Sequence, residues 1–175
     1  MFIIKSDRLS LWALSYEQVI ALSNNRNNLE KSIGLFLSTF ELNADENFLN
    51  ELAEALNSHI APMIKKNVAF YEWYTHWLIV DEQQKLTIGG IGGTGLPDAN
   101  GEVMIGYFID KKFEKQGYAT EALNSFVKWL FQNNDLLAVI ADTPVDNFGS
   151  QRVLQKAGFK RIGEVEEVIK WKLSR

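Results

Sequence analysis

The spacing of apolar residues changes twice along this chain, and that change restricts the fold more than any other feature of the sequence. Residues 15–60 carry the spacing of amphipathic helices, which predicts two or three helices. From residue 68 to 110 the chain is rich in aromatic and β-branched residues separated by turn residues, which predicts a meander of antiparallel strands. These strands are expected at 68–80, 86–91 and 102–110, after an initial strand within 2–14.

The last third of the chain alternates between the two spacings. An apolar stripe over Ala119–Leu130 predicts an amphipathic helix, and the short apolar run Leu136–Ala141 predicts a strand buried on both faces. A second helix follows and ends at Gly158, and Ile169–Leu173 alternates as a final strand. This order of elements predicts one mixed α/β domain over residues 1–175.

Composition removes several classes of protein. The chain has no cysteine, which excludes a disulfide framework, a thiolate metal site and a cysteine nucleophile. Two histidines, His59 and His76, are too few for a histidine-rich metal cage, so we expect no metal. A formal charge of −4 without a basic run argues against nucleic-acid binding, and no apolar run reaches the roughly 18 residues of a membrane span. The N-terminus is unlike a signal peptide, so we expect a cytoplasmic protein that binds no membrane.

Two glycine-containing segments are candidates for binding a phosphate. The first, Gly90–Gly95, has the spacing Gly-x-Gly-x-x-Gly of dinucleotide-binding proteins. That motif must open a helix, whereas Leu96-Pro97-Asp98 follows here as a turn. We therefore interpret these glycines as a strand end that another backbone or a ligand approaches closely.

The second segment, Glu114–Ala119, lies between a predicted strand and a predicted helix. The N–H groups at the start of a helix have no partner within it, and the helix dipole makes this end positive. Both properties favour a phosphate, and Gly117 would let a diphosphate approach without a Cβ in the way. From these residues alone, an ordinary glycine at a helix start is an equal alternative.

A third segment, Asp146–Ser150, follows the buried strand and opens the next helix. Asp146 or Asn147 can cap this helix, and Ser150 lies three residues after Asn147 on the same face. Taken alone, this segment is best interpreted as simple capping.

In combination, these segments resemble the GNAT superfamily of acetyl-CoA-dependent N-acetyltransferases, and most closely the branch that contains ribosomal-protein alanine N-acetyltransferases. Three stretches carry the resemblance: Ser6–Leu11, Ile105–Leu123 and Asn147–Phe159. It is detailed from about residue 100 to 165 and thin from 15 to 85. It implies a GNAT-like fold, in which a central, mostly antiparallel and splayed sheet is flanked by helices.

The resemblance also implies which residues bind acetyl-CoA. Backbone groups of the splayed strand would bind the pantetheine arm, the next loop would hold the diphosphate through its N–H groups, and Asn147 would hydrogen-bond the arm. The residues implied are Tyr107, Phe108, Ile109, Lys115, Gln116, Gly117, Tyr118, Ala119, Thr120 and Asn147. One position departs from the family, because Glu114 stands where Gln or Arg is frequent. We expect its carboxylate to point outward or to weaken cofactor binding.

The expected reaction is acetyl transfer to a primary amine of a small molecule or a protein N-terminus. Because a cysteine-bound acyl intermediate is impossible, direct attack in a ternary complex is favoured. Ser150 is the candidate catalytic residue, since the resemblance implies a place near the thioester sulfur, where it could donate a hydrogen bond to the leaving thiolate. The general base is left open among four residues: Glu72, Tyr74, His76 and Glu166.

Other interpretations stay open at this point. The chain could be a CoA-binding module without catalysis, or a partner-binding module with the same fold. The acceptor amine is not identified, and exposed strand edges would permit a homodimer. The aromatic cluster of Trp73, Tyr74 and Trp77 is interpreted as core packing in preference to a wall of the acceptor pocket.

Overall fold

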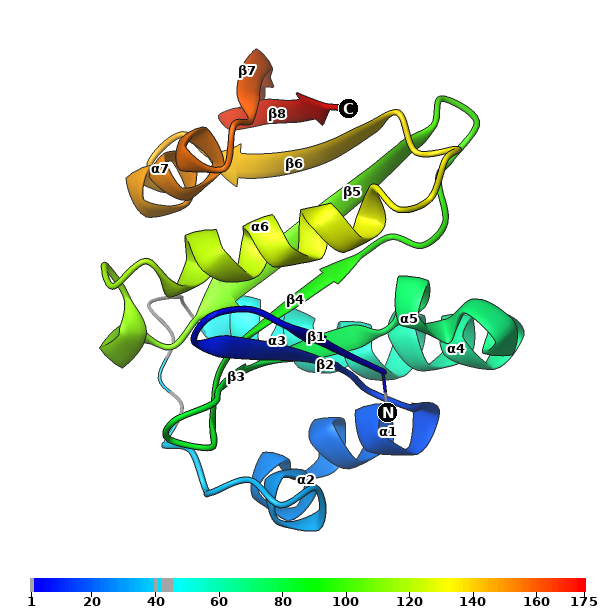
Figure 1. Cartoon of the computed structure of the whole chain (residues 1–175), viewed down its shortest axis with the longest axis vertical. Coiled ribbons are helices and arrows are strands. Elements are labelled where there is room, and N and C mark those ends of the chain that lie inside the picture. Colours follow the sequence, from blue (N-terminus) through cyan, green and yellow to red (C-terminus); the bar gives the residue numbers. More distant parts are fainter. Residues whose placement is uncertain (1, 40, 42–45) are drawn as a thin grey trace.

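The computed structural model describes residues 2–39, 41 and 46–175, and of residues 46–50 the backbone only. One sheet runs through the molecule in the order β1-β2-β3-β4-β5-β6-β8-β7 (Figure 1). Neighbouring strands are antiparallel except β5 and β6, which are parallel. The strands are β1 (Phe2–Lys5), β2 (Leu9–Ala13), β3 (His76–Asp81), β4 (Leu86–Gly93), β5 (Glu102–Ile109), β6 (Ala138–Pro144), β7 (Lys160–Val165) and β8 (Val168–Ser174).

Strands β5 and β6 pair over a short stretch and then diverge. Their pairing begins at Glu102 with Ala138 and ends at Met104 with Ile140. Beyond this point β5 continues beside β4, whereas β6 continues beside β8, and the two strands visibly part (Figure 1). We call the space between them the splay. The mixed α/β fold with a splayed, mostly antiparallel sheet is thus confirmed.

The helices lie on both faces of this sheet. They are α1 (Tyr16–Asn24), α2 (Arg26–Ser32), α3 (Glu46–Ala55), α4 (Ala61–Lys66), α5 (Tyr71–Tyr74), α6 (Tyr118–Leu130) and α7 (Phe148–Lys156). A π-helical turn at Leu56–Ile60 joins α3 to α4, and 3-10 turns lie at Val68–Phe70 and Lys111–Phe113. Within the described part of the chain, no helix combines the length and the apolar character that crossing a bilayer requires.

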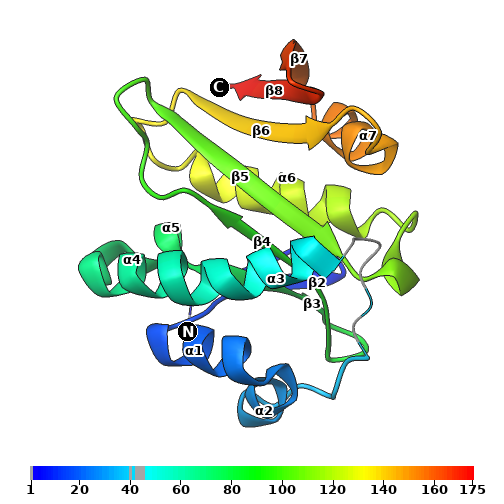
Figure 2. The ribbon, with the colours of Figure 1, turned by 180° about the vertical axis from the view of Figure 1, so that it is seen from behind.

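Each face of the sheet has its own hydrophobic cluster. Helix α6 lies on one face (Figure 1). It buries Leu123 and Phe126 together with Trp77 of β3. Helices α1, α2 and α4 lie on the other face (Figure 2). They bury apolar side chains together with Leu78 and Val80 of β3. Because side chains of a strand alternate between faces, one strand serves both clusters.

The structure corrects the sequence analysis in residues 68–80. Residues 68–74 form a 3-10 turn and α5, so the strand begins only at His76. The segment is aromatic because Trp73 packs against Trp129 of α6, with ring centroids 4.9 Å apart, and not because it pairs in the sheet. The two or three helices expected in 15–60 correspond to α1, α2 and α3.

Strands β1, β2 and β7 differ from expectation as well. The initial strand in 2–14 is two strands, β1 and β2, that pair antiparallel with each other. Strand β7 is absent from the sequence analysis. All six of its residues are exposed, so it carries no alternation of buried and exposed positions.

Candidate active site

The loop between β5 and α6 presents backbone N–H groups without acceptors. Gly117 is the N-cap of α6 and has φ = 85°, a left-handed conformation that glycine adopts without strain. From Lys115 to Thr120, no backbone N–H donates to a described acceptor, and the first such bond runs from Glu121 N to Gly117 O at 3.0 Å. Because these groups lie at the positive end of a 13-residue helix, the loop is suited to bind an anion.

Arg8 brings a cation to this loop from the N-terminal end of the chain. Its Nη1 donates to Gln116 O at 3.1 Å. Its Nη2 lies 3.5 Å from the position that a Cβ at Gly117 would take, and the guanidinium lies 4.2 Å from the ring centroid of Tyr118. The side chain is 46% exposed, so its other N–H groups are accessible. The sequence analysis assigned this arginine no role.

Glu121 fixes Arg8 in this position. Its carboxylate accepts hydrogen bonds from Arg8 Nε at 2.7 Å, from Arg8 N at 2.8 Å and from Ser6 Oγ at 2.8 Å. Burial raises the pKa of Glu121, but these hydrogen bonds outweigh burial and lower it, while the hydrogen bond to Glu121 raises the pKa of Arg8. Both groups therefore stay charged at neutral pH. Arg8 and Glu121 lie in two of the stretches that carry the resemblance, but no spacing rule connects positions 113 residues apart.

The start of α7 faces the splay from the side of β6. Asn147 is the N-cap of α7, and its Oδ1 accepts from Ser150 N at 3.0 Å, which confirms the capping interpretation. Its side-chain amide group donates to no described acceptor. From β5, the Tyr107 hydroxyl reaches Ser150, lying 3.0 Å from its Oγ and 3.2 Å from its carbonyl oxygen. The structure thus brings these three residues together.

The register of β5 decides which of its backbone groups face the splay. Met104 O accepts a hydrogen bond from Thr94 N, just after β4, and Asp110 N donates to Ile88 O of β4. The even-numbered residues of β5 therefore turn their backbone groups toward β4. Alternation then turns the N–H and C=O groups of Tyr107 and Ile109 toward the splay. Phe108 turns its backbone groups toward β4.

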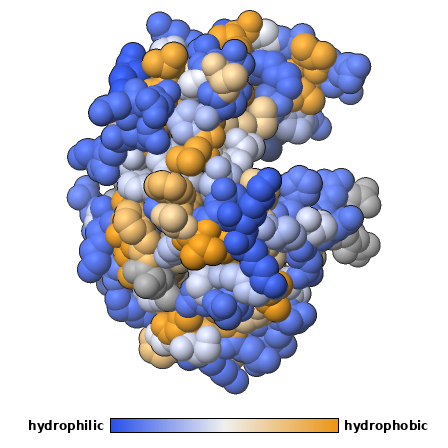
Figure 3. Space-filling view, turned by 90° about the vertical axis from the view of Figure 1, so that its right-hand side faces the viewer, coloured by the Kyte–Doolittle hydropathy of each residue, from blue (hydrophilic) through white to orange (hydrophobic). Residues whose placement is uncertain are grey.

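The face of β5 that points away from α6 carries a second cluster, around His76. The imidazole stacks on the Phe108 ring, with centroids 5.8 Å apart and planes 16° apart. Burial, with the charge of Arg26 as a second cause, lowers the pKa of His76 to about 3, so the ring is neutral at physiological pH. Beside it, a Cβ at Gly106 would meet no atom within 4 Å. The molecule is deeply hollowed on this side, between the level of β6 and β8 and the level of α4 (Figure 3).

The Gly-x-Gly-x-x-Gly segment lies in β4 and the turn after it, which confirms its interpretation as a strand approached closely by other groups. A Cβ at Gly90 would lie 2.4 Å from the His76 ring, and one at Gly95 would lie 2.2 Å from the Tyr74 ring. The aromatic cluster is core, as interpreted, because Trp77 is fully buried and its ring packs against Trp129.

The four candidates for a general base are not brought together. Glu72 and Tyr74 lie on α5, His76 begins β3, and Glu166 lies in the exposed turn between β7 and β8. A histidine with a pKa near 3 is a weak base for an ammonium group. Glu114 is partly buried before α6, and its effect on cofactor binding stays a prediction.

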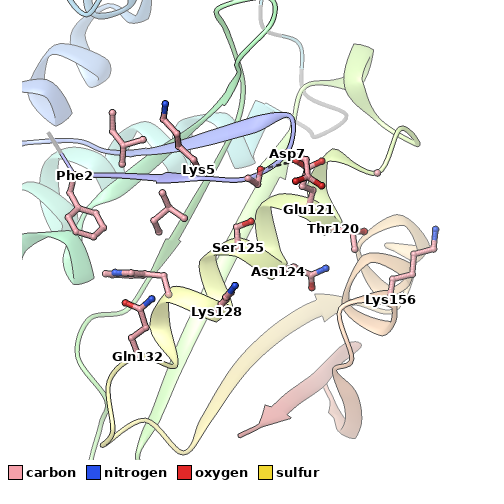
Figure 4. Close-up of a pocket in the computed structure, with 15 residues that line it drawn as sticks. Phe2, Lys5, Asp7, Thr120, Glu121, Asn124, Ser125, Lys128, Gln132 and Lys156 are labelled. Atoms are coloured by element: carbon pink, nitrogen blue, oxygen red, sulfur yellow. Dashed lines mark hydrogen bonds between the residues drawn. The ribbon is translucent and has the colours of Figure 1, made fainter.

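A groove of about 910 Å³ extends along α6 from the loop Lys115–Thr120, the candidate anion-binding loop (Figure 4). It begins at Gly117 and Thr120 and continues past Asn124 and Lys128. Strand β1 borders one side, and Lys156 of α7 reaches it from the other. The groove therefore adds space, and the three lysines Lys5, Lys128 and Lys156, next to the row of free N–H groups.

Comparison with known proteins assigns the chain to the acetyltransferases. Residues 39–160 match a family model described as an acetyltransferase (GNAT) domain. The chain therefore belongs to the GNAT acetyltransferase family. It is 27% identical over 159 residues to the uncharacterized N-acetyltransferase YjdG of Bacillus subtilis, which covers 91% of this chain and 90% of YjdG. It is 39% identical to the probable N-acetyltransferase YjcK of the same organism, over 38% of this chain and 36% of YjcK.

Solved structures share the fold. The ribosomal-protein-S5-alanine acetyltransferase of Vibrio fischeri superimposes with a TM-score of 0.69 at 16% identity, over 99% of this chain and 97% of that one. The ribosomal L7/L12 α-N-protein acetyltransferase RimL, solved in complex with coenzyme A, superimposes with a TM-score of 0.65 at 18% identity, over 99% and 98% of the two chains. At these identities the likeness concerns the fold.

Proposed function

We propose that this protein transfers the acetyl group of acetyl-CoA to a primary amine of a small molecule or a protein N-terminus, by direct attack in a ternary complex. The observation that carries the proposal is the row of N–H groups over Lys115–Thr120, at the positive end of α6 and close to the splay. A diphosphate offers the acceptor oxygens that these donors lack among the described residues. The splay offers an extended arm a path from this loop toward Ser150.

The residues of the chain fit the parts of this cofactor. The N–H groups of the loop would bind the diphosphate, and Arg8 would add a charged donor beside them. The outward backbone groups of Tyr107 and Ile109 would pair with the pantetheine arm as with an added strand. The free amide group of Asn147 would donate to the arm, and the groove along α6 has room for the nucleotide.

The reaction needs few groups from the protein. The amine nitrogen bonds to the thioester carbon, the carbon–sulfur bond breaks, and a proton from the amine ends on the released thiol. A backbone N–H of Tyr107 or Ile109 would donate to the developing oxyanion. Ser150 would donate to the departing sulfur.

The acceptor amine would enter from the side of the sheet that carries His76. The groove along α6 is assigned to the cofactor, and the hollow in Figure 3 opens on the opposite side. The open space above Gly106 and the apolar ring of Phe108 would border the acceptor. The neutral His76 would contribute a hydrogen-bonding group without a charge.

Thermal unfolding with and without cofactor tests binding first. Acetyl-CoA at 100 times its dissociation constant should stabilise the fold by about 2.7 kcal/mol. A panel of amines and N-terminal peptides, followed by release of free thiol, then tests transfer. The absence of any shift with acetyl-CoA or CoA would contradict the proposal, and binding without turnover on every acceptor would favour a non-catalytic module.

A further inference from the structure

The Tyr107 hydroxyl joins the two walls of the splay. Tyr107 lies on β5 beyond the last residue that pairs with β6, and Ser150 lies in the first turn of α7. The phenol oxygen is 3.0 Å from Ser150 Oγ and 3.2 Å from Ser150 O. Among the described side chains, the Tyr107 phenol is the only hydrogen-bonding partner of the Ser150 hydroxyl.

The number of hydrogen atoms in this contact limits what Ser150 can do. The phenol has one hydrogen, and the Ser150 carbonyl can only accept. When the phenol donates to that carbonyl, the Ser150 hydroxyl can donate its own hydrogen to the phenol oxygen. When the phenol donates to Ser150 Oγ instead, the serine hydrogen is free to point into the splay. Tyr107 thus decides whether Ser150 has a hydrogen to offer there.

Tyr107 is suited to donate and not to ionise. Burial raises its pKa to about 12, with the hydrogen bond to Ser150 opposing this rise. A thiol has an ordinary pKa of about 8.5, so the phenol keeps its proton when a thiolate forms nearby. A thiolate in the splay would attract the Ser150 hydrogen, and the phenol hydrogen would follow toward Ser150 Oγ, because aligned hydrogen bonds strengthen one another.

We propose that Tyr107 is a positioning residue that turns the Ser150 hydroxyl toward the sulfur of the bound thioester and thiol. This inference rests on the proposed function, since it requires the sulfur to reach the splay. Tyr107 acts through Ser150 and neither donates its proton to the sulfur nor touches the acceptor. The carrying observation is the double contact between one phenol oxygen and two atoms of Ser150 across the splay.

The first test measures binding and does not depend on turnover. Calorimetry at pH 9 compares CoA with desulfo-CoA, which differ at the sulfur, for wild type, Tyr107→Phe and Ser150→Ala. The wild type should prefer CoA by about tenfold, as expected for a hydrogen bond to a charged group. Both variants should lose this preference while binding desulfo-CoA as the wild type does. If Tyr107→Phe keeps the preference that Ser150→Ala loses, the inference is wrong.

The second test is a double-mutant cycle on kcat. If Tyr107 acts through Ser150, each single variant should lower kcat, with KM for acetyl-CoA changed less than twofold, and the double variant should be no slower than Ser150→Ala. Multiplying effects would overturn the inference. Ser174→Ala removes a hydroxyl at the exposed end of β8 and is the control, expected to leave kcat unchanged.

The two proposals fail in different ways. If the wild type binds no CoA and transfers no acetyl group, the proposed function fails and takes this inference with it. If the wild type is active and Tyr107→Phe behaves like the wild type in both tests, only the positioning role is lost.

Discussion

Replacing Gly117 by Asp or by Asn separates charge from shape at the anion-binding loop. Both side chains have nearly the same size, and both residues tolerate the left-handed conformation that Gly117 adopts at φ = 85°. A Cβ at this position meets only Arg8 Nη2, at 3.5 Å, which is an ordinary contact. The two variants should therefore fold equally well, each destabilised by about 1 kcal/mol.

The difference between these variants can be estimated from Coulomb's law. A carboxylate about 5 Å from a phosphate charge is repelled by about 0.8 kcal/mol in water and by about 3 kcal/mol at an effective dielectric constant of 20. The loop is exposed but lies against protein, so an intermediate value of about 1.5–2 kcal/mol applies, or roughly 10–30-fold in affinity. The introduced carboxylate would also compete for Arg8, which adds to the loss.

Titration calorimetry with CoA at 0.1 M and 1 M salt measures this difference. Gly117→Asn should bind CoA somewhat more weakly than wild type, and Gly117→Asp should bind a further tenfold or more weakly at 0.1 M. At 1 M salt the gap should shrink, because the Debye length falls from about 10 Å to about 3 Å. Equal affinities of the two variants at low salt would show that the diphosphate binds elsewhere, and the argument from free N–H groups would fail.

Three further predictions concern residues around this loop and on the opposite face. Arg8→Gln removes a cation and leaves the Glu121 carboxylate beside the loop, so calorimetry should show about tenfold weaker CoA binding; Arg161→Gln, in an ion pair on β7, should have no effect and is the control. Gly106→Leu fills open space on the His76 side. The kcat/KM for the amine should therefore fall at least tenfold, with CoA affinity within twofold of wild type. An equal loss of both quantities would contradict entry of the amine from that side. His76 binds a proton near pH 6.5 in the unfolded chain but only near pH 3 in the folded chain. Its contribution to the free energy of unfolding is therefore full above about pH 6.5 and is lost as the pH falls toward 3. The loss is at most about 1.4 kcal/mol per pH unit. Urea unfolding of wild type and His76→Gln between pH 7 and 4 should show the shallower pH dependence in the variant; identical slopes would refute it.

The elements that the sequence predicts well are those whose burial pattern is local. The stripe of α6 reports the core that it faces, and α6 forms where expected. The apolar run Leu136–Ala141 also predicts a strand, but β6 begins only at Ala138 and extends to Pro144, and Leu137 before it is exposed. Strand β7 is exposed along its length, and α5 is aromatic because of a distant helix, so local spacing misleads in both cases. The position of Gly117 at the start of α6 was predictable, because a loop between a strand and a helix is defined by its neighbours in sequence.

The contacts that complete the candidate site join residues far apart in the chain. Arg8 and Glu121 are 113 residues apart, and Tyr107 and Ser150 are 43 residues apart. No periodicity relates such positions, so their partners become visible only once the strand order is known. The same holds for His76, whose depressed pKa results from burial under elements that the sequence analysis could not assemble.

Under the proposed function, strand β5 would separate the two substrates on opposite sides of one sheet. The side chain of Tyr107 packs toward the α6 face and reaches Ser150, whereas the next residue, Phe108, stacks on His76 on the other face. A one-residue step along the strand is therefore a step from the proposed cofactor side to the proposed acceptor side. Apart from Arg8 and β1, the residues on the proposed cofactor side lie within 105–156, where the resemblance to the family is detailed. Helices α1, α2 and α4 pack on the proposed acceptor face, and they lie where the resemblance is thin. Changes in those helices should therefore alter which amine is used without altering how CoA is bound.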